Sequence, residues 1–268
     1  MEINGGKLYL DDPDDVFDVG LEKNFDTLLF GQNQPLQEEE KATTDSNTIK
    51  TNNEKIDPNE KSLVKGTRPF MMFIVGRPGE GKSALAQYVV WDKFHKKQID
   101  YILLVTSTPW NDDWSFIPKK AKKGEWNDEL LAKIKKVQTQ NERGHLCIVL
   151  EDQAGAFPWD DKNFTNLLIS HRHYNTSIII NMQYVNKVPP IVRECSSHVA
   201  IFHQYTDRSR QALYDSFGGS FLNKEEFYKT LNENTEERYY FMYYEAALFQ
   251  WSRCKITPIE TKGQVLKY

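Results

Sequence analysis

The chain has 268 residues, a formal net charge of −4 and a hydrophobic content of 39%, so it is long enough for one sizeable domain and an appendage. No apolar run approaches the roughly 20 residues of a membrane span, and the acidic N-terminus resembles no signal peptide. Three widely spaced cysteines form neither a zinc pattern nor a disulfide framework, which predicts reduced thiols and an intracellular protein.

The first 66 residues read as an acidic leader. Residues 1–61 carry 15 Asp and Glu against 6 Lys and Arg, which leaves 28 Lys and Arg against 23 Asp and Glu in the mildly basic remainder. Residues 36–61 hold almost no apolar side chain and no aromatic one, so they cannot bury enough surface to order themselves. Residues 14–31 mix apolar groups with acids, which fits either a docking peptide for a partner or a segment packed on its own domain. We expect a largely disordered leader over 1–66 and a folded domain over 67–268.

The stretch GRPGEGKS fits the pattern G-x-x-x-x-G-K-[ST] of a phosphate-binding loop. An apolar run, residues 71–75, precedes it as a predicted buried strand, and a helical stretch follows it. Lys82 is expected to reach the β- and γ-phosphates of a nucleotide, and the Ser83 hydroxyl to hold Mg²⁺. The predicted cofactor-binding residues are Gly76, Arg77, Pro78, Gly79, Glu80, Gly81, Lys82, Ser83 and Ala84.

Short apolar strands alternate with polar-faced helices from residue 67 onward, a pattern that predicts an α/β fold with a mostly parallel sheet flanked by helices. The predicted strands are 69–75, 101–106, 146–151, 177–182 and 198–202, the predicted helices are 82–97, 127–143, 161–174, 208–217 and 224–234, and residues 238–253 read as a C-terminal β-hairpin.

Two of these strands end in side chains suited to phosphate chemistry. The strand over 146–151 runs into Glu151 and Asp152, and an apolar strand ending in two acids places one carboxylate near Mg²⁺ and a second near the attacking water. The strand over 177–182 ends at Gln183, whose amide is suited to orient water or sense the γ-phosphate. Either feature could also be a strand that simply ends at solvent.

A basic segment, IPKKAKKGEW, follows the second strand. Its lysines are Lys119, Lys120, Lys122 and Lys123, and three tryptophans lie among or near them: Trp110, Trp114 and Trp126. This composition fits a nucleic-acid groove, and equally an insertion that packs onto the body.

The segments FIVGRPGEGKSAL, LCIVLEDQ and SHRHYNTSIIINMQY, in this order, resemble the FtsK–HerA superfamily, and within it the DNA-packaging ATPases of large eukaryotic DNA viruses and virophages. The resemblance covers about residues 67–205. It implies a RecA-like P-loop NTPase that hydrolyses ATP with Mg²⁺ and packages double-stranded DNA. It also implies a homo-oligomeric ring, a capsid or portal-vertex partner, and a place in the host cytoplasm, a viral factory or the virion. Members of that family usually begin the acidic pair with Asp; here Glu151 by position would help hold Mg²⁺ and Asp152 would be the base.

Three other classes fit the sequence less well. A GTP-driven switch needs N-K-x-D, and Pro189 stands where the aspartate would pair with guanine. A nucleotide kinase is favoured only if Arg208 and Arg210 form a lid over ATP; the alternative is a helix first turn capped by Thr206 or Asp207. A helicase would need further motifs and a second lobe, which the sequence does not show.

Arg172 is the predicted arginine that completes a neighbouring subunit's active site. Its turn leads into the strand that ends at Gln183, and we expect that turn along an edge of the nucleotide-bearing face. The alternative is a cation in the last turn of helix 161–174, stabilised by the helix dipole. The competing arginines are Arg193, Arg208 and Arg210.

Overall fold

The structure, a computed structural model, describes residues 62–140, 143–151, 157–259 and 265–266, together with three short strands near the N-terminus. The chain divides into two compact units, residues 1–48 with Tyr268 and residues 49–267. The first unit contains an antiparallel three-stranded sheet, with β1 at Ile3–Asn4, β2 at Lys7–Tyr9 and β3 at Val16–Asp18. The predicted linker over 36–61, and most of 14–31, lie outside the described residues.

The second unit is built on an eight-stranded sheet in the order β11-β10-β9-β4-β8-β7-β5-β6. Its strands are β4 (Met71–Val75), β5 (Tyr101–Thr106), β6 (Lys122–Lys123), β7 (Leu146–Glu151), β8 (Thr176–Met182), β9 (His198–Phe202), β10 (Tyr240–Glu245) and β11 (Gln250–Lys255). Within this sheet every pairing from β9 to β6 is parallel, and the β10–β11 hairpin joins β9 in antiparallel pairing. The predicted mostly parallel sheet with a C-terminal hairpin is confirmed.

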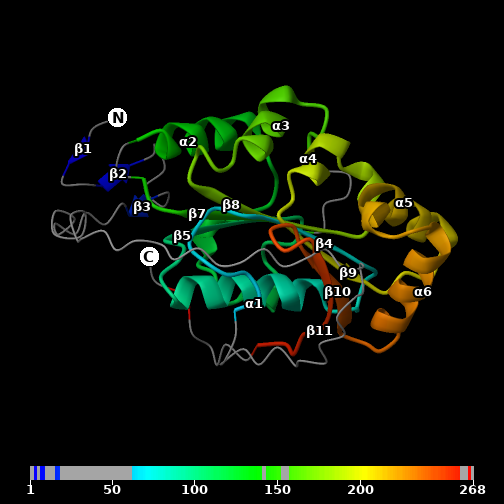
Figure 1. The fold of residues 1–268 in the computed structure, drawn as a ribbon. Helices are drawn as coiled ribbons and strands as arrows, with labels where there is room; N and C mark the ends of the chain where they lie inside the picture. Colours follow the sequence, from blue (N-terminus) through cyan, green and yellow to red (C-terminus); the bar gives the residue numbers. More distant parts are fainter. Residues whose placement is uncertain are drawn as a thin grey trace, which may run out of the picture. The chain divides into compact units, whose positions relative to one another are not determined.

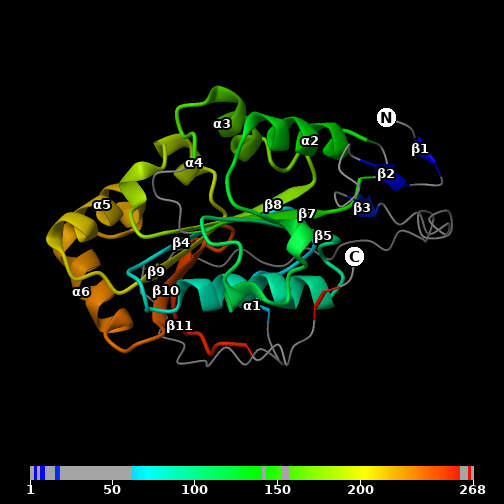
Figure 2. The same cartoon turned by 180° about the vertical axis from the view of Figure 1, so that it is seen from behind.

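Helices cover both faces of this sheet, as Figures 1 and 2 show. The helix α1 lies along one face, whereas α2, α3 and α4 lie on the other, and α5 and α6 lie near the end of the sheet that carries β9 and β10. Their bounds are α1 (Lys82–His95), α2 (Asp128–Gln138), α3 (Lys162–Ile169), α4 (Pro190–Glu194), α5 (Asp207–Phe217) and α6 (Lys224–Thr235). Because both faces are covered, the central strands are apolar throughout most of their length, and each residue of β4, β7 and β8 is buried.

Four of the described helices begin at a side chain that accepts a backbone N–H bond from their first turn, which is why their starts were predictable within a residue. The capping residues are Asn127, Asp161, Thr206 and Asn223 for α2, α3, α5 and α6.

Two helix ends were predicted too late. α2 ends at Gln138 and α3 at Ile169, where we expected 143 and 174. After α3 the chain turns back: the buried His171 ring bonds through Nδ1 with the Thr176 carbonyl at 2.8 Å, and Asn175 takes a left-handed φ of 46°. These local bonds replace a further helical turn in a segment that lacks an apolar repeat at helical spacing.

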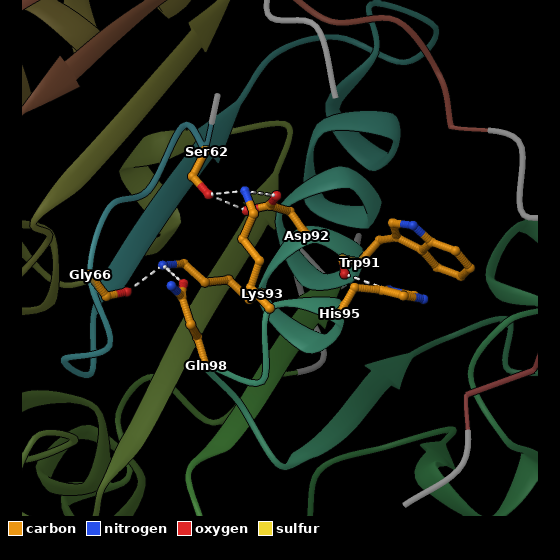
Figure 3. A network of polar contacts seen from close by, with 8 residues as sticks. Ser62, Gly66, Trp91, Asp92, Lys93, His95 and Gln98 are labelled. Carbon is orange, nitrogen blue, oxygen red and sulfur yellow. Dashed lines mark hydrogen bonds and ion pairs between the residues drawn. The ribbon is translucent and has the colours of Figure 1, made fainter. Parts of the chain in front are cut away.

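A polar network ties residues 62–66 to α1 (Figure 3). The buried Lys93 ammonium donates to the Gly66 carbonyl at 2.6 Å and to Gln98 Oε1 at 2.7 Å, and the Ser62 hydroxyl donates to Asp92 Oδ2 at 2.6 Å. Burial lowers the pKa of Lys93 to about 8. The described part of this unit therefore includes residues 62–66, which lie in the predicted leader.

The helices of the described ranges are too short or too polar for a bilayer. Among the residues that the structure describes, none forms a helix long and apolar enough to cross a membrane.

Candidate nucleotide-binding site

The predicted phosphate loop connects the central strand β4 to α1. Gly79 and Gly81 adopt φ values of 83° and 112°, in the left-handed region that disfavours L-residues. A Cβ on Gly81 would lie 2.8 Å from Cδ1 of Tyr239, and one on Gly76 would lie 2.6 Å from Cβ of Phe202. The loop's shape therefore needs glycine for backbone freedom at 79 and 81, and for space at 76 and 81.

The start of α1 differs from the four capped helices. Its N-cap is Gly81, which has no side chain to accept the first N–H groups. A helix start without a side-chain cap, together with the helix dipole, is suited to bind an anion. A helix start of this kind after a left-handed glycine is the local structure that the phosphate-loop motif predicts.

Lys82 is held inside the loop. Its side chain is 7% exposed, and its ammonium donates to the carbonyl of Arg77 at 3.0 Å. Ser83 and Ala84 follow in the first turn of α1. The motif thus brings one cation, one hydroxyl and the open helix start to the carboxyl end of β4.

The carboxylate of Glu151 lies beside this loop, oriented by two donors. Glu151 ends β7 and is level with Asn181 of β8 in the parallel register. Asn181 donates through Nδ2 to Glu151 Oε1 at 3.2 Å and to Ser83 Oγ at 3.5 Å. The indole N–H of Trp114 donates to the other oxygen, Oε2. Asn181 therefore links the phosphate loop to the acidic strand.

The sequence analysis missed the role of Asn181 and the hydrogen bond from Trp114 to Glu151. The signal for Asn181 was present: it is a polar residue inside the apolar run SIIINM, two residues before the Gln183 that we chose instead. No sequence signal indicated the contact of Trp114, because this residue lies 37 positions from Glu151 along the chain.

The donor set suits a hard cation. The hydroxyl of Ser83 and the carboxylate of Glu151 are oxygen ligands, and the buried Oδ1 of Asn181 has no hydrogen-bond partner among the described residues. Mg²⁺ takes such ligands, typically one or two from protein and the others from phosphate and water. No cluster of three His, Cys, Asp or Glu side chains occurs within the described ranges, so these residues form no cage made of protein alone.

Other segments brace the loop from outside. The Arg77 guanidinium lies 4.3 Å from the ring centroid of Tyr205, whose hydroxyl donates to Glu80 Oε1 at 3.4 Å. Arg238 donates through Nε to the Gly79 carbonyl at 3.2 Å. The segments after β9 and before β10 therefore reach the tip of the phosphate loop, which sequence reasoning did not foresee.

Of the other two predicted polar residues, Gln183 is among the described residues and Asp152 is not. Asp152 lies outside the described residues, so its role stays a prediction. Gln183 lines a cavity with Gln204 and Arg208, next to Val75 at the end of β4.

The structure corrects the predicted position of Arg172. It is exposed and follows α3 rather than belonging to its last turn. In the parallel pairing of β8 with β4, Met182 is level with Val75, so the turn before Thr176 lies at the amino edge of the sheet. The phosphate loop begins at the opposite, carboxyl edge. The two edges are one strand length apart, which for the seven residues of β8 at about 3.3 Å each is about 23 Å. Arg172 therefore lies about that far from the edge on which we expected it.

The structure bears on the kinase interpretation through the helix cap and through Arg210. Thr206 accepts from the N–H of Ser209 and caps α5, as the alternative interpretation predicted. Arg210 pairs with Asp207 at 2.6 Å and lies 5.3 Å from the Tyr228 ring centroid, so it is engaged along its own helix and with α6.

The basic segment lies at the edge of the sheet. Lys119 and Lys120 are exposed on a short 3₁₀ turn, and Lys122 and Lys123 form the half-buried edge strand β6. Trp114 and Trp126 are buried and pack this insertion onto the body, whereas Trp110 is 78% exposed. Only Trp110 of the three is placed where a groove interpretation would need it.

These features define a P-loop NTPase fold: the strand order, the glycine loop at the end of β4, and the carboxylate of Glu151 at the end of β7, two strands away. The chain belongs to the family described as "Poxvirus A32 protein", whose profile matches residues 59–210. This confirms the predicted resemblance to the viral branch of the superfamily.

Relatives agree with this placement. "Uncharacterized protein 015R" of Frog virus 3 (isolate Goorha) is 22% identical over 193 residues, which cover 69% of this chain and 59% of that protein. The chain thus spans about three fifths of that relative's length. Among solved structures, the genome packaging NTPase B204 of Sulfolobus turreted icosahedral virus 2 in complex with AMPPCP matches with a TM-score of 0.55 at 15% identity, covering 73% of this chain and 100% of B204. Its complex with ATP-gammaS gives 0.55 at 17% identity over the same shares. These structures share the fold.

Proposed function

We propose that this protein is a Mg²⁺-dependent ATP hydrolase that drives double-stranded DNA into a viral capsid. The observation that carries the proposal is the hydrogen-bonded group formed by Ser83, Asn181 and Glu151 beside a glycine phosphate loop. Membership in the Poxvirus A32 family supports it, as does the shared fold of B204, which is described as a genome packaging NTPase.

The residues of the site divide the chemistry between them. Lys82 and the N–H groups at the start of α1 would bind the β- and γ-phosphates. Ser83 and Glu151 would hold Mg²⁺, which would supply positive charge next to the phosphoryl oxygens. Asn181 and Trp114 donate to the two oxygens of the Glu151 carboxylate, so the ligand oxygens are in place before nucleotide arrives. Asp152 is proposed as the base that takes the proton of the attacking water.

Gln183 is proposed as the polar sensor of the γ-phosphate. Its position next to the loop supports this role. The N–H of Gly76, the first residue of the loop, donates at 3.3 Å to the carbonyl of Met182, the residue before Gln183. This bond joins the start of the loop to the end of β8, directly before Gln183.

The proposed assembly is a homo-oligomeric ring that works with double-stranded DNA and a capsid or portal-vertex protein, in the host cytoplasm, a viral factory or the virion. Arg172 is proposed to act on a neighbour's nucleotide; its exposed turn at the amino edge of the sheet would then have to meet the phosphate loop of the next subunit. Mixing Lys82→Ala subunits with Arg172→Ala subunits tests this, because mixed rings contain some interfaces with both groups intact and should regain activity. Mixed rings that stay inactive would exclude the role.

The decisive experiment for the function is the rate of ATP hydrolysis with and without double-stranded DNA. A packaging motor should be stimulated by the polymer, whereas a nucleotide kinase should need a small phosphate acceptor. Lys82→Ala should abolish turnover while the protein stays folded, and Lys229→Ala, which removes an exposed lysine of α6, is the matched control. A folded Lys82→Ala variant with normal turnover would refute the ATPase proposal.

A further inference from the structure

A four-residue turn, Glu237 to Tyr240, lies between α6 and β10 and contacts the tip of the phosphate loop. The N–H of Tyr240 donates to the carbonyl of Glu237 at 3.1 Å and closes the turn. Its third residue, Tyr239, has a φ of 70°, in the left-handed region that a bulky side chain rarely adopts. Strain of this kind persists only where the surrounding structure holds it, and it gathers at functional sites. The turn lies beyond residues 59–210, the range that the family profile matches.

The turn is held in place by the C-terminal hairpin. The side chain of Glu237 accepts from Arg253 of β11 at 2.8 Å, and the carbonyl of Tyr239 accepts from the N–H of Ile256 at 3.0 Å. The guanidinium of Arg253 also lies 4.2 Å from the ring centroid of Tyr240. Because these contacts do not involve the phosphate loop, the turn is a support for the loop that is fixed independently of it.

Two neighbouring residues of the turn contact the two left-handed glycines of the loop. Arg238 donates through Nε to the carbonyl of Gly79 at 3.2 Å, and its guanidinium lies 4.8 Å from the Tyr239 ring centroid. The Tyr239 ring lies against Gly81, since a Cβ there would be 2.8 Å from Cδ1 of the ring. The pair therefore contacts the loop at the two positions where glycine leaves the backbone most free.

The bond from Arg238 sets the direction of the peptide group between Gly79 and Glu80. In a trans peptide the C=O and the N–H point to opposite sides. With the Gly79 carbonyl turned to Arg238, the N–H of Glu80 points to the other side, where it donates to the Arg77 carbonyl at 3.5 Å. The Lys82 ammonium donates to that same carbonyl at 3.0 Å. The Glu80 N–H and the Lys82 cation therefore face one place inside the loop.

We propose that Arg238 is a positioning residue for phosphate binding: it holds the Gly79 carbonyl so that the Glu80 N–H, together with Lys82, is directed at a phosphate oxygen of the nucleotide. This inference rests on the function proposed above. The 3.5 Å bond from Glu80 to Arg77 is long beside the usual range of about 2.7–3.2 Å, so a charged phosphate oxygen is a better acceptor and can replace it. In this role Arg238 acts through the backbone of the loop and does not itself contact the nucleotide.

The test compares Arg238→Met with Arg238→Lys in the full-length protein, by titration calorimetry with Mg-AMPPCP, an ATP analogue that is not hydrolysed. Both variants keep a long apolar stem beside Tyr239, but only Lys can donate to the Gly79 carbonyl. The Met variant should bind Mg-AMPPCP about tenfold more weakly, the effect of losing one hydrogen bond to a charged group, and the Lys variant should stay within about threefold of the wild type. Arg238 is exposed, so both variants should fold.

Arg143→Met is the matched control. Arg143 also donates to a backbone carbonyl, that of His173 at 3.3 Å, but these two residues precede β7 and β8 and lie at the opposite edge of the sheet from the loop. Its affinity for Mg-AMPPCP should equal that of the wild type.

A second measurement reads the positioned group directly. In protein labelled with ¹⁵N-glutamate, the amide resonance of Glu80 should shift when Mg-AMPPCP binds to the wild type or to Arg238→Lys. At saturating Mg-AMPPCP the same resonance should shift less in Arg238→Met, because the peptide is no longer held. A loss of stem packing alone would not separate the Met variant from the Lys variant.

Three results would overturn the positioning role and leave the proposed function standing: equal affinities for Arg238→Met and the wild type, equally weak binding in the Met and Lys variants, or weaker binding in Arg238→Met with an undiminished shift of the Glu80 resonance. The last result would place Arg238 on the nucleotide itself. A folded wild-type protein that binds no Mg-AMPPCP would instead refute the proposed function, and this role with it.

Discussion

Trp114→Phe removes the indole N–H that donates to Glu151 while keeping an aromatic ring in place. A hydrogen bond to a charged group contributes about 1.5–3 kcal/mol to stability, and here the acceptor is a buried carboxylate. For a domain of about 200 residues, each kcal/mol shifts the melting temperature by roughly 2–4 °C. Removal of this bond alone therefore predicts a melting temperature lower by roughly 3–12 °C.

A second tryptophan provides the control for the change in volume. Trp126 is also buried and packs on Phe164, with ring centroids 4.8 Å apart, whereas Trp114 packs on Phe116 at 5.6 Å. Trp126→Phe removes the same atoms without taking a donor from Glu151. The difference between the two variants in urea unfolding isolates the hydrogen bond.

The catalytic consequence is read from Mg²⁺. With one of its donors removed the Glu151 carboxylate is held less firmly, so the half-saturating Mg²⁺ concentration for ATP turnover should rise in Trp114→Phe and not in Trp126→Phe. Combining Trp114→Phe with Glu151→Gln should give less than the sum of the two single effects, because both act on one hydrogen bond. Equal melting temperatures for the two tryptophan variants, with an unchanged Mg²⁺ requirement, would refute the reasoning.

Three further predictions follow from single structural features. The Gly81→Ala variant should bind nucleotide more weakly and have a lower melting temperature than Gly79→Ala. Both substitutions strain the backbone by about 1–2 kcal/mol, but only the first places a Cβ 2.8 Å from Tyr239. Equal melting temperatures and affinities would exclude that steric clash. Lys93 has a pKa of about 8 when folded and 10.5 ordinarily, so the unfolded chain binds more protons in that window and stability rises with pH across it, by at most about 1.4 kcal/mol per unit. The stability of the wild type relative to Lys93→Met, measured by urea unfolding, should rise between these pH values, and a constant difference would contradict the burial argument. Replacing the exposed Lys119 and Lys120 by Glu should make the slope of log binding constant against log salt concentration shallower by about two, near 0.9 for each phosphate that the protein no longer neutralises. An unchanged slope would mean that DNA binds elsewhere on the protein.

The sequence alone determined most of the secondary structure and the core of the site. Strands 101–106, 146–151 and 198–202 were predicted with their observed bounds, because a strand covered on both faces is a nearly uninterrupted apolar run. The phosphate loop was predictable because its glycines serve local backbone geometry. Both signals lie within a few neighbouring residues.

Only the tertiary structure decided which distant side chains meet. Asn181 reaches Glu151 because the parallel register sets β8 beside β7, and Trp114 reaches it because the insertion after β5 folds back over the sheet edge. The same register separates Arg172 from the phosphate loop by the length of β8, although Arg172 and Gln183 are only 11 positions apart in the sequence. Strand order is fixed by packing across the whole sheet, and no local pattern encodes it; the sequence could therefore name the chemistry of the site but not all of the residues that hold it in place.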